Sequence, residues 1–235
     1  MSEDHSIARS IAQHLRALRL QISRRQITWI DFALSAARLY IADHKPMRAA
    51  ALLATLTELD QEQRLQAALL EAAIESAQDS GHKSCSLTMI VCDEGDNIVS
   101  CLDTVDAIMD ELVICDTGST DDTVGKARMY GATIVYHEWE QDFSKARNAA
   151  IDHARGDWIF WMDADDRLEA PSAHTLQTLW RTGSAQAAAV RIRSLVAKGG
   201  EVEFMQVRLF PRHHRLRFER RIHEQIMFAV QRQAI

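Results

Sequence analysis

The residues with the clearest chemical potential form an acidic cluster behind an apolar run. Residues 157–162 read Asp-Trp-Ile-Phe-Trp-Met, which predicts a buried strand, and Asp163, Asp165 and Asp166 follow. On an extended backbone, residues two apart share a face, so we expect Asp163 and Asp165 to converge and Asp166 to point away. Converging carboxylates repel unless a cation or a proton lies between them. The pattern predicts a site for Mg²⁺ or Mn²⁺, which take further ligands from substrate phosphates. The alternative is a solvated loop that caps the strand.

An alternation of strand-like and helix-like segments would place this cluster at one edge of a sheet. Apolar runs at residues 87–91, 111–115, 132–136 and 158–162 alternate with helical patterns at residues 98–108, 121–130 and 143–154. Such units build an α/β fold with a parallel, helix-covered sheet, whose ligands bind outside the carboxyl ends of the strands. Acidic residues follow those ends at Asp93, Glu94, Asp116 and Asp163. Two later strands, at residues 187–193 and 201–210, are expected to form a hairpin.

The turn at residues 116–121, Asp-Thr-Gly-Ser-Thr-Asp, combines structural and functional candidates. Gly118 permits a sharp turn, and Asp121 and Asp122 suit the positive end of the next helix, so we assign these two acids to capping. Asp116 precedes the turn and has no such duty. A carboxylate at the end of a strand in this kind of sheet can accept a hydrogen bond from a base or a ribose hydroxyl. Asp116 is therefore a candidate nucleotide-binding residue.

Composition narrows the class of protein. The 235 residues suffice for one large domain or two small ones, and 47% hydrophobic residues with three prolines are typical of a globular protein. The formal net charge of -6 argues against a nucleic-acid partner. The four cysteines form no C-x-x-C motif, which predicts buried free thiols in a reducing compartment. No apolar run approaches the roughly 18 residues of a membrane span, so we expect a cytoplasmic protein without a transmembrane segment.

The chain changes character near residue 80. Residues 1–80 are rich in Ala, Leu, Gln and Glu with apolar residues at helical spacing, which predicts a small α-helical domain before a second domain at residues 81–235. Residues 29–56 are loosely similar to a tetratricopeptide hairpin, although the small and aromatic positions are out of register. A groove for a protein partner is the functional interpretation of these helices, and a plain helical cap is the alternative. The polar residues 78–84 are expected to be a linker.

Several short stretches between residues 86 and 226 together resemble family-2 glycosyltransferases. In order, they are residues 87–91, Asp93-Glu94 with Asn97-Ile98, the turn at 116–121, Glu138-Trp139, Asp142-Phe143 with Ala146-Arg147-Asn148, Gly156-Asp157-Trp158, Asp163-Ala164-Asp165, residues 207–210, Arg217-Phe218-Glu219 and residues 222–225. No single piece is specific, but their order and spacing are. A nicotinamide enzyme is disfavoured because no G-x-G-x-x-G follows the first strand, and a P-loop kinase lacks its glycine-lysine signature too.

The resemblance implies a GT-A fold, a Rossmann-like and mostly parallel sheet with helices on both faces, that binds a nucleotide-diphospho-sugar. Glu94 and Asp116 match residues that hold the base and the ribose in the family. Arg147 matches an arginine near the nucleotide. Asp163 corresponds to the first acid of the family's D-x-D motif, which leans toward the ribose.

The same resemblance implies transfer of the sugar to an acceptor with inversion. Asp165 corresponds to the acid that ligates Mn²⁺ or Mg²⁺, and His223 is a candidate to complete the metal's ligands or to touch the diphosphate. Inversion requires a base that deprotonates the acceptor, and Glu224 is the candidate for this role. The sequence does not specify the acceptor, the sugar or the nucleotide's base.

Some positions depart from the family pattern. Asp93 stands where the family usually has Asn, and Arg220 stands where relatives often have Gly and is expected to crowd the site. The chain ends soon after Glu224, so we expect a catalytic domain truncated at its carboxyl terminus. This leaves two alternatives to an active enzyme: a catalytically inactive nucleotide-sugar-binding or scaffold protein of the same fold, and a helical adaptor that the sheet supports.

The carboxyl-terminal segment is rich in arginine. Its alternating Arg and apolar residues predict a strand over residues 209–218 whose polar face is solvated or points toward a diphosphate. The alternative is a patch that binds anionic lipid or nucleic acid.

Overall fold

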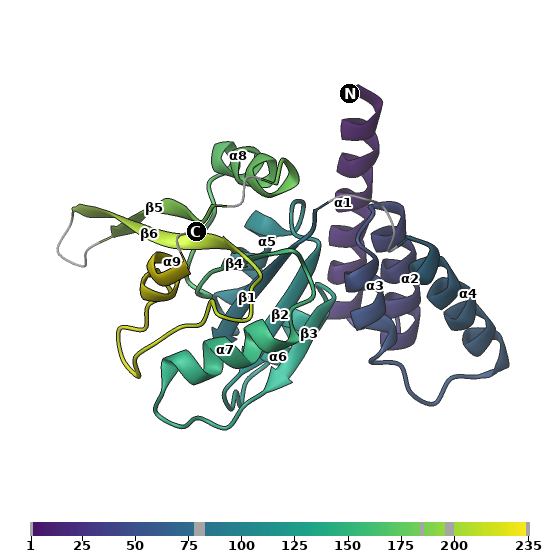
Figure 1. Ribbon diagram of the computed structural model, residues 1–235. Coiled ribbons are helices and arrows are strands. Elements are labelled where there is room, and N and C mark those ends of the chain that lie inside the picture. Colours follow the sequence, from purple (N-terminus) through teal and green to yellow (C-terminus); the bar gives the residue numbers. More distant parts are fainter. Residues whose placement is uncertain (1, 78–82, 184–185, 196–199, 234–235) are drawn as a thin grey trace.

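The computed structural model describes residues 2–77, 83–183, 186–195 and 200–233, which form a helical layer beside a helix-covered sheet (Figure 1). The helical layer consists of α1 (Ser2–Ser23), α2 (Trp29–Ala42), α3 (Pro46–Leu53) and α4 (Gln61–Ala77). Thr28 caps α2 by accepting a hydrogen bond from Asp31 N at 3.1 Å, and Pro46 begins α3 as expected. The four helices share one core, in which Phe32, Tyr40 and Leu52 are almost fully buried.

The second part of the chain forms a six-stranded sheet in the order β3-β2-β1-β4-β6-β5. Its strands are β1 (Cys85–Val91), β2 (Glu111–Asp116), β3 (Ala132–Tyr136), β4 (Trp158–Trp161), β5 (Ala188–Leu195) and β6 (Glu201–Pro211). The first four are mutually parallel, whereas β6 is antiparallel to both β4 and β5. The expected α/β fold class and the expected β5–β6 pairing are confirmed. The connection between β5 and β6 lies partly outside the described residues.

Helices cover both faces of the sheet, so its central strands are buried on both sides. On one face, α5 (Ile98–Val105), α6 (Thr123–Arg128) and α8 (Ala170–Arg181) contribute to a core that includes the fully buried Trp180. On the other, α7 (Phe143–His153) and α9 (Met227–Gln233) pack with Trp161 and Phe210. β1, β2 and β4 are nearly continuous apolar runs, and burial of both their faces under the helices stabilises the sheet.

A buried cluster of charged and aromatic residues attaches the helices to the sheet. Asp106, just after α5, accepts hydrogen bonds from Arg19 Nη1 at 2.8 Å and from Arg48 Nη2 at 2.5 Å. Both guanidinium groups also donate to the hydroxyl oxygen of Tyr40, which itself donates to Tyr130 O at 3.1 Å. Arg19 stacks over the Tyr130 ring at 3.7 Å. We call Arg19, Arg48, Asp106, Tyr40 and Tyr130 the docking cluster, because it links α1–α3 to the sheet.

The structure corrects two expectations about local structure. The strand expected over residues 209–218 ends at Pro211. Arg212 still donates its backbone N–H to Asp157 O at 2.7 Å and its Nε to Gly156 O at 2.6 Å, but the chain then turns at residues 214–215. Cys85, Cys101 and Cys115 are buried free thiols as expected, but Cys92 is exposed because it follows the last residue of β1. Residues 78–82 of the expected linker lie outside the described residues. Among the helices that the structure describes, none is long and apolar enough to cross a membrane.

Candidate functional site

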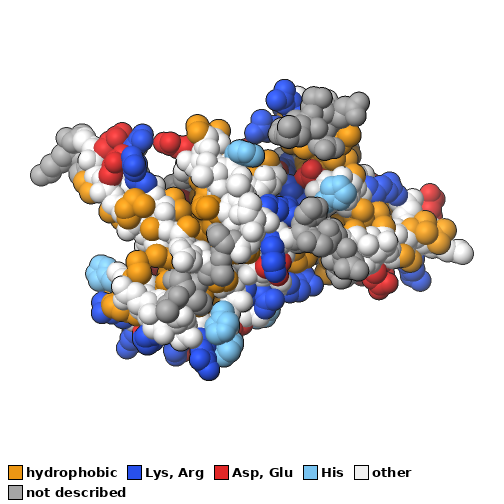
Figure 2. Space-filling model, turned by 45° about the horizontal axis from the view of Figure 1, so that its top comes forward, with side chains coloured by type: hydrophobic (Ala, Val, Ile, Leu, Met, Phe, Trp, Pro, Cys, Tyr) orange, Lys and Arg blue, Asp and Glu red, His pale blue; other side chains and the backbone are white. Residues whose placement is uncertain are grey.

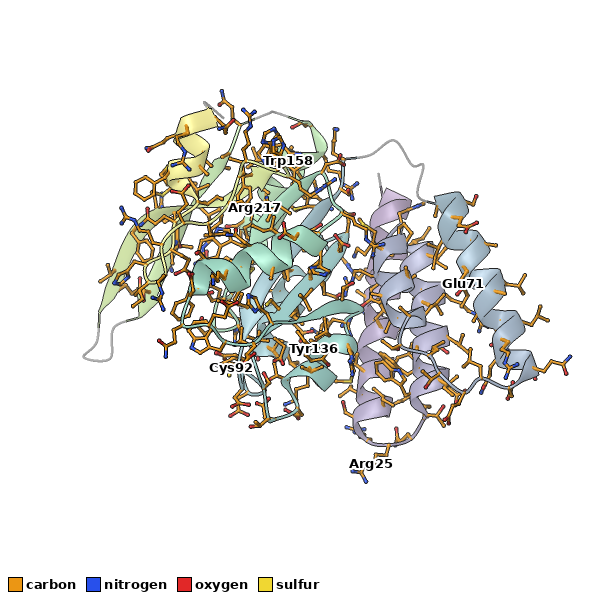
Figure 3. All side chains as sticks on the ribbon, turned by 60° about the horizontal axis from the view of Figure 1, so that its bottom comes forward. Arg25, Glu71, Cys92, Tyr136, Trp158 and Arg217 are labelled. Carbon is orange, nitrogen blue, oxygen red and sulfur yellow. The ribbon has the colours of Figure 1, made fainter. Side chains whose placement is uncertain are left out.

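The carboxyl ends of the parallel strands surround a cavity of about 710 Å³. Five predicted site residues line this cavity: Glu94, Arg147, Asp163, Asp165 and Glu224. The other lining residues are Ile90, Val91, Cys92, Thr117, Trp139, Phe143 and Ala164. Figure 3 shows Cys92 at the end of the sheet opposite to Trp158, where β4 begins. The cavity therefore lies where a helix-covered parallel sheet binds its ligands.

Arg147 on α7 is the centre of the cavity's polar network. Its Nε donates to Glu224 Oε1 and its Nη2 donates to Asp163 Oδ1, both at 2.7 Å. The guanidinium carbon lies 4.2 Å from the centre of the Trp161 ring, and the side chain is only 7% exposed. Its Nη1 is buried without a hydrogen-bond partner among the described residues. A buried cationic donor without a partner is costly, so its presence beside a cavity favours an anionic ligand.

The acidic cluster after β4 adopts a turn rather than an extended strand. β4 ends at Trp161, and Asp166 N donates to Asp163 O at 3.1 Å. The alternation of faces stops where the strand stops, so the expectation for Asp166 was wrong, whereas Asp163 and Asp165 both line the cavity. Asp166 does not point away: its Oδ2 accepts from Asp163 N and from Arg208 Nη1, both at 2.9 Å. Burial raises the pKa of Asp166 above its ordinary value, although the Arg208 charge opposes this.

Asp163 and Asp165 have different surroundings on this turn. Asp163 is paired with Arg147 and lies 3.8 Å from Arg208 Nη2. Asp165 is exposed, lines the cavity and forms no ion pair within the described part of the chain. Two arginines therefore lie against Asp163, whereas Asp165 has no cationic partner among the described residues.

The donor set fits a divalent cation that shares its ligands with a substrate. Within the described ranges, no three His, Cys, Asp or Glu side chains are close enough to form a metal cage. Mg²⁺ is commonly bound by one or two carboxylates together with substrate phosphates and water, and Asp165 offers such a carboxylate beside the cavity. His223 is exposed, does not line the cavity and has a φ of 55°. The structure does not bring His223 together with Asp165 in a ligand set.

The two acids expected to hold the base and the ribose also differ. Glu94 lines the cavity, and its Oε2 accepts from Asn97 Nδ2 at 2.9 Å. Asp116 is 4% exposed, and its Oδ1 accepts from Ser119 N at 3.2 Å. Asp116 therefore does have a structural duty, contrary to our expectation, because it holds the turn that follows β2. Asp121 Oδ1 accepts from Thr123 N at 2.9 Å at the start of α6, as expected of a capping acid. Asp122 is the N-cap residue but forms no side-chain capping bond; it pairs with Lys126 at 3.0 Å instead.

Sequence reasoning missed part of the site. Asp93 Oδ1 accepts from Thr120 N at 2.6 Å and so ties the loop after β1 to the turn after β2. Arg208 stacks over Trp161 at 3.7 Å and is 5% exposed, so it is a buried member of the network and not a solvated arginine of the basic segment. Trp139 and Phe143 form an edge-to-face pair at 4.8 Å that lines the cavity. Their presence in the motifs of the resemblance was the available signal.

Comparison with known proteins identifies the family. Residues 86–234 match the family described as glycosyl transferase family 2, and this match covers more than half of the chain. The chain belongs to glycosyl transferase family 2, and its sheet with helices on both faces has the GT-A architecture.

Similar curated proteins are longer than this chain. A TPR repeat-containing protein of Synechococcus elongatus is 37% identical over 152 residues, which is 63% of this chain and 37% of that protein. The glycosyltransferase SunS of Bacillus subtilis is 33% identical over 99 residues, which is 41% of this chain and 24% of SunS. The chain thus spans less than two fifths of the length of either relative.

Two solved structures share part of the fold. TarS of S. aureus in complex with UDP has a TM-score of 0.41 and 18% identity, over 50% of this chain and 37% of that chain. Glucosyl-3-phosphoglycerate synthase of Mycobacterium tuberculosis, solved with Mn²⁺ and UDP, has a TM-score of 0.38 and 22% identity, over 45% of this chain and 42% of that chain.

Proposed function

We propose that this protein transfers a sugar from a nucleotide-diphospho-sugar to an acceptor, with inversion and with the help of Mn²⁺ or Mg²⁺. The observation that supports this proposal most is Arg147 Nη1, a buried cationic donor without a partner beside a cavity at the carboxyl ends of the strands. A phosphate oxygen is the group that best satisfies such a donor. Membership of the family makes a nucleotide-sugar the natural source of that phosphate.

The donor would be held by residues on three strand ends. Glu94 lines the cavity beside β1, and the exposed ring of Trp139 offers a face for a base. Asp116 shapes the turn after β2, where both of its carboxylate oxygens accept from Ser119 N, and a remaining lone pair would accept from a ribose hydroxyl. Asp163, fixed by Arg147, would accept from the same ribose. These assignments place the diphosphate between Arg147 and Asp165.

Asp165 is the carboxylate that would hold the cation, and His223 would join it only after the loop before α9 rearranges. When bound, the cation neutralises the negative charge that grows on the departing nucleoside diphosphate. Arg147 and Arg208 supply further fixed positive charge on the same side of the cavity, within 4 Å of Asp163. Arg147 and Arg208, together with the cation held by Asp165, would thus fix the diphosphate before the sugar is transferred.

Glu224 is positioned to act as the base. Arg147 holds its Oε1, while its Oε2 has no hydrogen-bond partner among the described residues. In the proposed step, Oε2 takes the proton of the acceptor's nucleophile, and the nucleophile's electron pair forms the bond to the anomeric carbon. The bond from that carbon to the diphosphate breaks on the opposite face, and its electron pair leaves with the nucleoside diphosphate.

Isothermal titration calorimetry tests the donor site. Uridine diphosphate is expected to bind in the presence of Mn²⁺, and Asp165→Ala is expected to weaken binding by at least about tenfold. Asp152→Asn, which alters an exposed carboxylate on α7, serves as the control and should bind like the wild type. Binding that is equally strong without a divalent cation, or unaffected by Asp165→Ala, contradicts the metal assignment.

One observation favours a second function, a nucleotide-sugar-binding protein without catalysis. The ion pair between Arg147 Nε and Glu224 Oε1, at 2.7 Å, restrains the carboxylate that a base would need to move freely. Measurement of product formation distinguishes the two functions. A product that forms with the wild type and is lost in Glu224→Gln, while donor binding persists, rules out the binding-only function.

A further inference from the structure

One edge of β6 has no strand neighbour over most of its length. β6 pairs with β5 from Glu201 to Leu209, but it pairs with β4 only at Leu209, Phe210 and Pro211. Between residues 201 and 206, the described structure contains no backbone hydrogen bond across the edge that faces away from β5. The antiparallel ladder leaves every second residue's N–H and C=O directed to that edge. Such an edge is a template for another extended chain.

A pocket of about 190 Å³ lies at this open edge. It is lined by Trp161, by residues 204–207 of β6 and by residues 224–227 before and at the start of α9. Four consecutive strand residues alternate between the two faces, so a pocket that they line together is at the strand's edge and not on either face. Phe204 and Met205 are 46% and 62% exposed, although both are large and apolar. The pocket can therefore receive an apolar side chain.

Glu224 connects this pocket to the nucleotide cavity, because it lines both of them. A nucleophile held at the open edge of β6 would reach Glu224 from a pocket that Arg147 does not line, whereas the proposed diphosphate lies in the cavity that Arg147 does line. In an inverting transfer the nucleophile attacks the face opposite to the leaving group, so two separate cavities that meet at Glu224 suit such a transfer.

The charges near the pocket favour a neutral occupant. In the described part of the β5–β6 hairpin, Arg191 and Arg193 pair with Glu203, and Arg193 also pairs with Glu201. These two arginines and two glutamates cancel. The remaining charge of the described hairpin, Arg208, is buried and paired with Asp166, so this part of the hairpin presents no exposed net charge that would attract an anionic lipid surface. Figure 2 shows red and blue side chains next to each other at the same end of the molecule as the β5–β6 hairpin, with orange apolar side chains beside them.

We propose that the acceptor is an extended polypeptide segment that adds to the open edge of β6. Its backbone would pair with residues 201–206, an apolar side chain would enter the pocket at Phe204 and Met205, and a serine, threonine or cysteine side chain would reach Glu224. This inference rests on the proposed sugar transfer. In the reaction, the side chain's O–H or S–H proton passes to Glu224 Oε2, the oxygen or sulfur bonds to the anomeric carbon, and the nucleoside diphosphate leaves with the bonding electrons.

To test this proposal, the full chain is incubated with Mn²⁺, a panel of labelled nucleotide-sugars and a set of matched acceptors, and transfer of the label is measured. The acceptors are short synthetic peptides with apolar residues around one central Ser, Thr or Cys, the same peptides with central Ala, the same peptides with alternate backbone amides N-methylated, neutral oligosaccharides, and vesicles of phosphatidylcholine with phosphatidylglycerol. We expect label in the peptides with a nucleophile, at least about tenfold less in the N-methylated peptides, and none in the Ala peptides. Label confined to oligosaccharides or vesicles overturns the inference.

Variants of the pocket sharpen the test. Phe204→Asp and Met205→Asp are expected to raise KM for the peptide by about tenfold or more, while uridine diphosphate still binds, because neither residue lines the nucleotide cavity. Leu65→Asp, which replaces an equally exposed apolar residue on α4, is the control and should change neither quantity. Unchanged KM in both pocket variants overturns the inference. A wild type that releases nucleoside diphosphate from the donor but labels no peptide refutes the acceptor alone, whereas one that neither binds nor cleaves any donor refutes the sugar transfer as well.

Discussion

The docking cluster and the cavity at the carboxyl ends of the strands contain nearly the same kinds of residue. They differ in how completely their buried polar groups are hydrogen-bonded. In the docking cluster, Arg19 and Arg48 surround Asp106 and stack on tyrosine rings, and neither has a buried nitrogen without a partner. In the cavity, Arg147 and Arg208 surround Asp163 and stack on Trp161, and Arg147 Nη1 has no partner in the described structure. A closed network of this kind stabilises the fold, whereas an open one is completed by a ligand.

We call Arg147, Arg208, Asp163, Trp161 and Glu224 the open cluster. The largest effect is expected there, from Glu224→Gln. The amide retains an oxygen that accepts from Arg147 Nε, but it cannot take a proton, so kcat should fall by about 10²–10⁴-fold. Nucleoside diphosphate release from the donor in the presence of acceptor measures the effect. Glu62→Gln, an exposed change on α4, is the matched control. Retention of full activity in Glu224→Gln would remove the catalytic role from this cluster.

Substitutions in the docking cluster should change the free energy of unfolding rather than the activity. Arg48→Met removes one of the two cations that pair with the buried Asp106 and should lower the free energy of unfolding by about 3–5 kcal/mol. Urea denaturation provides the measurement, and Arg38→Met, on the exposed face of α2, should have little effect. Similar losses in both variants would show that the docking cluster has no special role.

Arg147→Lys tests the open cluster with the charge preserved. The guanidinium of Arg147 donates to Glu224 and Asp163 and directs a third donor from the same rigid plane. The ammonium of a lysine is a single point charge and cannot reproduce these three directions. We expect diphosphate binding to weaken by about 1.5–3 kcal/mol, with a smaller change in the free energy of unfolding. Calorimetry and urea denaturation separate the two quantities. A loss of stability as large as that in Arg48→Met, with unchanged binding, would make Arg147 structural and abolish the contrast between the clusters.

Gly131 tests how closely the helical layer approaches the sheet. Its φ is 68°, and a Cβ there would lie 2.8 Å from Arg48 O, so Gly131→Ala should cost about 1–3 kcal/mol in unfolding free energy. Gly125→Ala in α6, where a Cβ meets no atom within 4 Å, should be neutral or stabilising. Equal stabilities of the two variants would contradict the close packing at the docking cluster.

The smallest expected effect is a pH dependence of stability from Asp106. Burial alone would raise the pKa of Asp106, but Arg48 and Arg19 outweigh it and hold that pKa well below its usual range. The unfolded chain then binds this proton more readily than the folded protein, so the stabilisation is complete above about pH 4 and is lost as the pH falls toward the folded value. Urea denaturation at a series of acidic pH values should show a shallower slope for Asp106→Asn than for the wild type. Identical slopes would contradict the argument.

The sequence predicted the strands well because they are buried on both faces. Continuous apolar runs such as residues 87–91 and 111–115 are typical of strands that are covered on both faces. Of the acids that follow the strands, Glu94, Asp163 and Asp165 line one cavity at the carboxyl edge of the sheet. Prediction failed where a strand ends. The rule of alternating faces was extended past Trp161 into a turn, and past Pro211 into a segment anchored by Arg212.

Contacts between distant residues could not be predicted from spacing. The Arg147–Glu224 ion pair joins residues 77 positions apart, and the Arg208–Asp166 pair joins residues 42 apart. Both depend on how α7, β6 and the segment before α9 come together. Asp116 shows the opposite case, since its hydrogen bond to Ser119 N is local and was overlooked in favour of a ligand role.

The central claim is that the free donor of Arg147 binds the diphosphate of a nucleotide. The most direct measurement compares the affinities of nucleoside diphosphates and the corresponding nucleosides by calorimetry with Mn²⁺, in the wild type and in Arg147→Gln. We predict that the wild type binds at least one diphosphate more than about tenfold tighter than its nucleoside, and that Arg147→Gln loses most of this difference. Equal affinity for diphosphate and nucleoside in the wild type, or an undiminished difference in Arg147→Gln, would contradict the account.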